Sequence, residues 1–382
     1  MSFAPSDRAA VAPFHVMRVL AAAARRAETG APVFDLTAGQ PSTPAPAPVL
    51  AAARRALEDQ VLGYTEAPGI VPLRTAIAGH YRHRYGLEVD PSQVYVTTGS
   101  SGAFLLAFLS AFDVGDRVGL ARPGYPAYRN ILQALGCQVI DLPCGPETRY
   151  QPTIDMIVDL DLDGLVVASP ANPTGTMLDP AELAALAGHC AAQGIRLISD
   201  EIYHGIDYTG QPSCSWSTDR SGFVINSFSK YFSMTGWRIG WMLVPDDLAD
   251  PVDALAGNMA ICPPALAQYA AVSAFDAYDE CDGHVARYAV NRGLLLDGLR
   301  ALGITELAPA DGAFYVYANV AHLTDDTQTF CGRLLDETGV AVAPGIDFDQ
   351  IDGPRSLRMS FAGATSTITG GLHALGEFLH RG

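Results

Sequence analysis

Residues 93–112, "QVYVTTGSSGAFLLAFLSAF", decide the fold, because they lead from a short strand across a Gly-Ser turn into an apolar helix. Short apolar runs separated by helix-like stretches recur along the middle of the chain. They are "DRVGLA" (116–121), "CQVIDL" (137–142), "GLVVAS" (164–169), "IRLISD" (195–200), "GFVINS" (222–227) and "GWMLVP" (240–245). Several are apolar almost throughout, as is typical of strands covered on both faces. Repeated strand–helix–strand units predict an α/β domain with a mostly parallel central sheet flanked by helices.

The C-terminal third has a different pattern. Residues 284–303 predict a long helix, and "GAFYVYANV" (312–320) and "RSLRMSFA" (355–362) predict alternating strands. These elements suggest a smaller α+β unit, against which the N-terminal 44 residues are expected to pack. We therefore predict a large domain of residues 45–280 and a small domain built from residues 1–44 and 281–382. A chain of 382 residues is long enough for two such units.

Composition excludes several classes of function. The formal net charge of −17 disfavours binding to nucleic acid and to anionic membranes, and no apolar run approaches the roughly 20 residues that span a bilayer. Seven cysteines without a Cys-x-x-Cys pair predict reduced thiols, and the first residues lack the blocks of a signal peptide. We expect a cytoplasmic protein. The histidines show no convincing ligand set, so we expect no metal, and we place His80 and His83 on a solvated helix face.

One residue type is unusually rare. Lys230, in "NSFSKYFSMTGWRIGW" (226–241), is the only lysine, and every other fixed positive side chain is an arginine. Most surface lysines can be replaced by arginine at little cost, but a lysine that must lose its proton cannot, because guanidinium stays protonated. Either Lys230 survived by chance in solvent, or it has a chemical role such as forming a Schiff base with an aldehyde.

Polar groups follow several of the predicted strands, at the edge of the sheet where ligands of α/β proteins bind. Ser100 and Ser101 open a helix whose free amides suit a phosphate, although such a start is often an ordinary cap. Asp200 ends the strand 195–200; it either caps a helix or faces a protonated ring nitrogen. Tyr203 could reach the same ligand with its hydroxyl.

Further polar and aromatic groups follow other strands. Asn172 lies in the Pro-flanked turn "SPANPTG", which is either only a turn or a rigid support for an amide donor. Tyr125 belongs either to the core or to a planar ligand on which it stacks. Near Lys230, the hydroxyls of Ser227 and Ser229 and the guanidinium of Arg238 suit a phosphate dianion. Arg358, further along the chain, suits a carboxylate. Pyridoxal 5′-phosphate (PLP) has the ring, ring nitrogen, phosphate and aldehyde that this set requires.

From about Phe14 to the C-terminus, the chain resembles the class I/II aminotransferases, which are fold-type I PLP enzymes of the aspartate aminotransferase-like superfamily. The order and spacing of many short segments carry the resemblance. They are "LTAGQPSTPAP", "LGYTEAPGIVPLRTAIAGHY", "TTGSSGAF", "RPGYPAY", "SPANPTG", "SDEIY", "SFSKYFSMTGWRIGW", "DGAFYVY", "VAVAPGIDF" and "SLRMSFA".

The resemblance implies a role for each matching residue. Lys230 matches the Schiff-base lysine, Asp200 the partner of the pyridine nitrogen, and Asn172 and Tyr203 the donors to the phenolic oxygen of the ring. Tyr125 matches an aromatic residue that stacks on the cofactor. The phosphate site would comprise Ser100, Ser101, Ser227, Ser229 and Arg238. Tyr64 matches a tyrosine that reaches the phosphate in the neighbouring subunit, which implies a homodimer with shared active sites. Arg358, with the backbone at Gly39 nearby, matches the site for the α-carboxylate of the substrate.

The implied activity is a ping-pong transfer of an amino group between an L-amino acid and a 2-oxo acid. Lys230 would move the Cα proton, which requires a lowered pKa. Relatives that prefer aspartate use a second cation for its side chain, whereas the corresponding segment 257–270 offers Ile261 and Cys262. With "VAPFHVM" (11–17) expected to line the pocket, this favours a neutral or apolar amino acid, unless a loop arginine such as Arg129 enters the site.

Departures from the family pattern lie at Gln40, at Ser42 and Thr43, and at Asp349, where glycine is usual. They put the substrate class in doubt rather than the cofactor. Two alternatives remain open. One is a PLP-dependent carbon–sulfur β-lyase, which would release pyruvate and ammonia without an added oxo acid. The other is a non-catalytic PLP-binding regulator, although such proteins usually carry a fused DNA-binding domain, for which we see no room before Phe14.

Overall fold

The computed structural model describes residues 4–210 and 212–381. Its largest sheet has seven strands in the order β2-β8-β7-β6-β5-β3-β4. These strands are β2 (Val94–Thr97), β3 (Arg117–Arg122), β4 (Gln138–Pro143), β5 (Gly164–Ala168), β6 (Arg196–Asp200), β7 (Phe223–Ser227) and β8 (Gly240–Leu243). Each lies within one of the seven predicted strand regions or extends it by one residue. Only β8 runs antiparallel to its neighbours, so the prediction of a mostly parallel sheet is confirmed.

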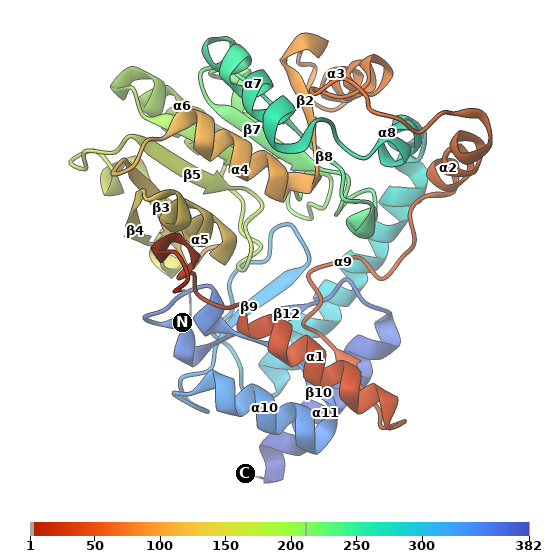
Figure 1. The fold of residues 1–382 in the computed structure, drawn as a ribbon. Coiled ribbons are helices and arrows are strands. Elements are labelled where there is room, and N and C mark those ends of the chain that lie inside the picture. Colours follow the sequence, from red (N-terminus) through yellow and green to blue (C-terminus); the bar gives the residue numbers. More distant parts are fainter. Residues whose placement is uncertain (1–3, 211, 382) are drawn as a thin grey trace.

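Helices flank this sheet in the upper part of Figure 1. They are α2 (Ala47–Asp59), α3 (Val71–Tyr85), α4 (Gly99–Ala111), α5 (Pro126–Leu135), α6 (Pro180–Gln193), α7 (Ala249–Ala260) and α8 (Ala265–Ala271). Helix α6 begins and ends as its sequence predicts. Asp179 and Glu182 form a capping box at its start, and Gly194 takes the left-handed conformation at its end, with φ +72°.

The long helix α9 (Tyr278–Ala301) leads from this part to a smaller one, drawn below the sheet in Figure 1. There, a three-stranded antiparallel sheet has the order β11-β12-β9, and β1 pairs in parallel with β10. The remaining elements are α1 (His15–Glu28), β1 (Phe34–Asp35), β9 (Tyr315–Asn319), α10 (Thr327–Thr338), β10 (Val340–Ala341), β11 (Ala343–Pro344), β12 (Ser356–Ser360) and α11 (Thr365–Arg381).

Residues from both ends of the chain therefore meet in the smaller part, as the β1–β10 pair shows. Residues 7–9 instead contact α5, beside the large sheet, where the amide of Asn130 donates a hydrogen bond to the carbonyl oxygen of Ala12. The domain boundaries at residues 45 and 280 stay a prediction. The predicted domain ranges also contain residues 1–3, 211 and 382, which lie outside the described residues.

Strand β12 has the predicted alternation of apolar and polar residues, but both of its faces are buried. Leu357 and Met359 lie in the main hydrophobic core, as the alternation predicts. The alternating polar residues Ser356, Arg358 and Ser360 are buried as well. The second face of this strand is covered because Arg358 lines the cavity described below and lies between two aromatic rings.

The prediction that His80 lies on a solvated helix face is wrong, whereas His83 is exposed. His80 is buried, and its Nδ1 lies 2.7 Å from the hydroxyl of Tyr278. Burial, followed by the charge of Arg84, lowers the pKa of His80 to about 3. Helix α3 buries this face because it packs against the segment that follows α8. Among the helices of the described residues, none combines the length and the apolar character needed to cross a bilayer.

Candidate active site

A cavity of ≈ 620 Å³ lies at the carboxyl ends of the large sheet, between that sheet, β12 and α1. All but two of the residues predicted for the site line it. They are Gly39, Ser100, Ser101, Tyr125, Asn172, Asp200, Tyr203, Ser229, Lys230, Arg238 and Arg358. The two exceptions are Ser227 and Tyr64. The parallel topology explains the convergence, because the loops after β2, β3, β5, β6 and β7 open at the same edge.

Lys230 follows β7 and points into the cavity. Its Nζ donates a hydrogen bond of 2.6 Å to the carbonyl oxygen of Gly39. Burial, followed by the positive charges of Arg358 and Arg238, lowers the pKa of Lys230 to about 8, while the charge of Asp200 acts in the opposite direction. The amine can therefore lose its proton near neutral pH, as proton transfer or attack on a carbonyl requires.

Asp200 ends β6 and is buried. One carboxylate oxygen accepts a hydrogen bond from the hydroxyl of Tyr128, and the other accepts one of 3.0 Å from the backbone N–H of Ile202. Burial raises the pKa of Asp200 to about 6, although both hydrogen bonds and the charge of Lys230 lower it. With this pKa the carboxylate is mostly ionised at neutral pH, and it is disposed to pair with a cation that enters the cavity.

The start of α4 is suited to an anion. The preceding residue, Thr98, makes no side-chain bond to the helix. Gly99 has φ +67°, and a Cβ at this position would lie 2.4 Å from Nη2 of Arg238. Only glycine lets the guanidinium approach the helix terminus so closely. Helix amides, the hydroxyl of Ser229 and this guanidinium thus border one polar corner of the cavity.

Ser227 lies behind this corner rather than in the cavity wall. Its Oγ is 2.9 Å from Oγ of Ser229 and 3.0 Å from the carbonyl oxygen of Ile239, and it accepts a hydrogen bond from the backbone N–H of Ser229. Ser227 therefore orients Ser229, which itself lines the cavity. The sequence alone does not tell which of the two serines lines the cavity and which one lies behind it.

Arg358 lies on the opposite wall and is only 4% exposed. It donates hydrogen bonds to Oδ1 of Asn172 (3.0 Å) and to the carbonyl oxygen of Thr37 (2.8 Å), while its Nε is buried without a partner. Its guanidinium carbon is 4.4 Å from the ring centroid of Tyr315 and 4.7 Å from that of Phe348. A guanidinium held between two rings and bordering a cavity is suited to bind a carboxylate.

Three aromatic residues of the site were not predicted individually. Tyr128 binds Asp200, the hydroxyl of Tyr315 lies 2.8 Å from that of Tyr203, and Phe348 covers Arg358. Tyr128 and Tyr315 occur in "RPGYPAY" and "DGAFYVY", so these segments marked the region without indicating the contacts.

Other expectations about the pocket have mixed outcomes. Phe14, Val16 and Met17 line the cavity, as predicted for segment 11–17. Arg129 does not enter it, because this residue lies on α5 and forms an ion pair with Asp141 of β4. Ile261 and Cys262 are also absent from the cavity wall of this chain, and Sγ of Cys262 accepts a hydrogen bond from the backbone N–H of Thr65.

The four residues that depart from the family pattern lie at different distances from the cavity. Gln40 borders the cavity. The Ser42 hydroxyl donates to the carbonyl oxygen of Ala362, and the Thr43 hydroxyl lies 2.9 Å from that of Ser233. Asp349 forms an ion pair with Arg122 outside the cavity.

Comparison with known proteins places this geometry in a family. The profile of "Aminotransferase class I and II" matches residues 31–375. A valine–pyruvate aminotransferase of Mycobacterium tuberculosis is 58% identical over 378 residues, with 97% of each chain covered. The crystal structure of an aminotransferase from Mycobacterium tuberculosis has a TM-score of 0.98 at 56% identity, and that of a putative aminotransferase from Silicibacter pomeroyi has 0.94 at 48%; both cover 100% of each chain. The chain belongs to the class I and II aminotransferase family and is an enzyme that transfers amino groups between amino acids and 2-oxo acids.

Proposed function

We propose that the enzyme binds PLP in the ≈ 620 Å³ cavity and that its preferred amino donor is a neutral or apolar L-amino acid. Enzymes of this family generally depend on PLP. Three features of the cavity fit the cofactor. The uncapped start of α4 beside Arg238 suits the phosphate, the buried Asp200 suits a protonated ring nitrogen, and Lys230, with a pKa of about 8, suits an aldehyde.

The residues that would hold PLP follow from this fit. Ser100, Ser101, Ser229 and Arg238 would bind the phosphate, with Ser227 supporting Ser229. Tyr125 would stack on the ring, and Asn172 and Tyr203 would face its phenolic oxygen. When bound, PLP supplies an aldehyde for the amino group and an electron-accepting ring that makes the substrate Cα–H acidic.

The chain's own residues then orient the substrate and move a proton. Arg358 would bind the α-carboxylate, because its Nε is unpartnered and its guanidinium is held in place. Lys230, as a neutral amine, would accept the Cα proton on Nζ and then donate it from Nζ to the carbon that carried the cofactor's aldehyde, acting first as base and then as acid. The first oxo acid would leave the site before the second oxo acid enters it, so we expect ping-pong kinetics.

The observation that carries the substrate proposal is the set of charges in the cavity wall. Among the described residues that line the cavity, the cations are Lys230, Arg238 and Arg358. The aldehyde, the phosphate and the α-carboxylate would occupy all three, which leaves no cation for a side-chain carboxylate. The side of the cavity formed by α1 and the residue before it is apolar, with Phe14, Val16, Met17 and Leu20. The valine–pyruvate aminotransferase at 58% identity supports valine as donor and pyruvate as acceptor.

A panel of amino acids added to the holoenzyme tests this proposal. Without an acceptor, loss of the cofactor absorbance band should require at least about tenfold lower concentrations of valine, alanine or methionine than of aspartate or glutamate. Pyruvate added next should restore the band and yield alanine. A preference for aspartate would contradict the substrate class, and pyruvate and ammonia released from cysteine-like donors without any oxo acid would favour a lyase.

The pKa of Lys230 predicts how cofactor capture depends on pH. Only the neutral amine attacks an aldehyde, and with a pKa of about 8 roughly a tenth of it is neutral at pH 7. We expect the rate at which cofactor-free protein captures PLP to rise about fivefold from pH 7 to pH 8, and less than about twofold above that. Stopped-flow absorbance measures this rate. A rate that keeps rising about tenfold per pH unit up to pH 10 would mean that the lysine has its ordinary pKa.

We also propose that the enzyme is a homodimer in which Tyr64 contacts the phosphate in the partner's site. Tyr64 is 83% exposed, between α2 and α3. Leu57 and Val61, which precede it in the chain, are exposed as well, and so is Ile261, whose neighbour Cys262 accepts a hydrogen bond from Thr65. Such a patch is typical of an interface. We further propose a cytoplasmic location, which is supported by cysteines that are free throughout the described residues.

Tyr64→Phe tests the shared site. Loss of one hydroxyl that binds phosphate should weaken PLP binding about tenfold, as measured by equilibrium dialysis, and leave the dimer mass in light scattering unchanged. Val61→Asp should instead raise the monomer fraction, because it puts a charge into the apolar patch. A wild-type enzyme that is monomeric in light scattering and still binds PLP would contradict the proposed dimer.

A further inference from the structure

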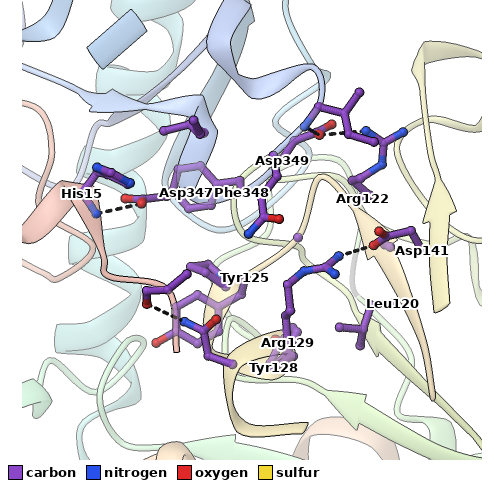
Figure 2. A pocket seen from close by; sticks show the side chains of 18 of the residues that line it. His15, Leu120, Arg122, Tyr125, Tyr128, Arg129, Asp141, Asp347, Phe348 and Asp349 are labelled. Carbon is purple, nitrogen blue, oxygen red and sulfur yellow. Dashed lines mark hydrogen bonds and ion pairs between the residues drawn. The ribbon is translucent and has the colours of Figure 1, made fainter. Parts of the chain in front are cut away.

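Three consecutive residues, Asp347, Phe348 and Asp349, lie between β11 and β12 and border a second cavity of ≈ 350 Å³. Figure 2 shows them facing Arg122, Arg129 and Tyr125 across this cavity. Each of the three makes a contact with a different part of the molecule, and each contact leads toward the active site.

Asp347 holds the start of α1. Its two carboxylate oxygens accept hydrogen bonds from the backbone N–H groups of His15 (2.8 Å) and Val16 (2.7 Å). A carboxylate at this place satisfies amides that have no partner within the helix. Asp347 therefore positions α1, the helix that lines the active-site cavity with apolar side chains.

Phe348 links the substrate arginine to the large sheet. Its ring lies 4.7 Å from the guanidinium carbon of Arg358. Its carbonyl oxygen accepts a hydrogen bond of 3.0 Å from the backbone N–H of Gly124, which precedes Tyr125. The ring that covers Arg358 is thus tied to the loop that carries a predicted cofactor-stacking residue.

Asp349 fixes this arrangement through an ion pair. Its Oδ1 lies 2.8 Å from Nη1 of Arg122, the last residue of β3, and the two side chains are 5% and 11% exposed. The same oxygen accepts hydrogen bonds from the backbone N–H groups of Ile351 and Asp352. Nη1 of Arg122 also lies 3.5 Å from Oδ2 of Asp352, but the side chain of Asp352 is 57% exposed. Removing Asp349 therefore takes away the closer and buried partner of Arg122, whereas removing Arg122 leaves the buried Asp349 carboxylate without its cation, and either change loosens the contact.

We propose that Arg122 and Asp349 are positioning residues for substrate binding. Their ion pair holds residues 347–349 against the end of β3, so that Phe348 keeps Arg358 aimed at the cavity and Asp347 keeps α1 beside it. The proposal rests on the role of Arg358 proposed above. It gives a function to Asp349, which stands where the family usually has glycine.

The chain offers a matched control in the same cavity. Arg129 and Asp141 also form an ion pair there, but α5 and β4 carry them, and neither element belongs to the smaller part of the molecule. This pair is more exposed than the Arg122–Asp349 pair, with side chains 21% and 37% exposed. Among the described residues, no hydrogen bond or ion pair joins it to residues 347–349, so breaking it removes an ion pair of the same residue types without releasing those three residues. Figure 2 shows both pairs.

The test compares KM and kcat of holoenzymes carrying Asp349→Asn, Arg122→Gln, both changes together, Arg122→Lys, and Arg129→Gln. Asparagine keeps the oxygen that accepts from Ile351 and Asp352, so Asp349→Asn removes mainly the charge. We expect each of the first two variants to raise KM for both the amino donor and the oxo acid about 10- to 100-fold, with kcat changed less than about fivefold. The double variant should be no worse than the poorer single variant by more than about twofold, because both remove one interaction.

Arg122→Lys keeps a cation and should bring KM back to within about fivefold of wild type, and Arg129→Gln should change KM less than about twofold. KM values within twofold of wild type in Asp349→Asn, additive effects in the double variant, or an equal effect of Arg129→Gln would overturn the proposal. Should Arg122→Gln fail to fold, Asp349→Asn decides alone. An inactive wild type that forms no PLP absorbance band would refute the proposed function itself, whereas an active wild type with normal variants refutes only the positioning role.

Discussion

Lys230→Arg should abolish turnover, lowering kcat/KM at least about 10⁴-fold, which corresponds to more than about 5 kcal/mol of transition-state stabilisation. Arginine keeps a positive charge in the cavity but stays protonated, so it can neither attack an aldehyde nor accept the Cα proton. The proposed role of Lys230 requires a neutral amine, which is accessible because burial lowers its pKa to about 8. Steady-state transamination and the absorbance spectrum of the purified variant measure both losses.

Folding is the control for this variant. Lys230 points into a cavity of ≈ 620 Å³ rather than into the packed core, so a larger side chain has room. We expect wild-type circular dichroism and retained, non-covalent PLP binding. Turnover above about one per cent of wild type would mean that another group takes up the aldehyde and the proton. No other lysine is available for this role, because Lys230 is the only one in the chain.

Asp200→Ala should lower kcat about 10³-fold, a loss of about 4 kcal/mol. With no carboxylate beside it, the ring nitrogen of the cofactor would lose the charge that favours its protonated form, and the ring would accept electrons less well. The substrate carboxylate would still meet Arg358, so KM should change much less than kcat. Steady-state kinetics with valine and pyruvate separate the two effects.

A graded comparison sharpens this test. Tyr128→Phe removes only the hydroxyl that donates to Asp200, so the carboxylate stays in place and activity should fall about tenfold or less. If Asp200→Ala cost no more than Tyr128→Phe, the carboxylate would have no special role. If KM rose as strongly as kcat fell, Asp200 would act on substrate binding rather than on the chemistry.

The seven strands and most of the site were predictable from the sequence for one physical reason. Buried parallel strands require apolar runs, and their topology brings the following loops to the same edge. Asp200 at the end of β6 and Lys230 after β7 therefore meet although no local pattern links them. The positive φ of Gly99 and the approach of Arg238 to this glycine, by contrast, became visible only in the structure.

What the sequence could not supply were contacts set by tertiary packing. The alternation of β12 is real, but the polar face of that strand is buried because Arg358 lies under Phe348, a residue from another segment. His80 appeared solvent-facing because its helix pattern says nothing about the segment packed on it. Arg129 is kept out of the active-site cavity by its ion pair with Asp141 on β4, a partner that lies on a different element and is not marked by any local pattern.

The pairing of β1 with β10 has a consequence for how the enzyme matures. The carbonyl oxygen of Thr37, just after β1, accepts a hydrogen bond from Arg358, which lies 321 residues further along the chain. Ribosomes deliver the N-terminal segment first, so its strand stays without a neighbour during almost the whole of translation. Closing so long a loop costs conformational entropy, so we expect this contact to form late in folding. A nascent or C-terminally truncated chain therefore lacks Arg358, and with it the proposed carboxylate site, until β12 has been synthesised.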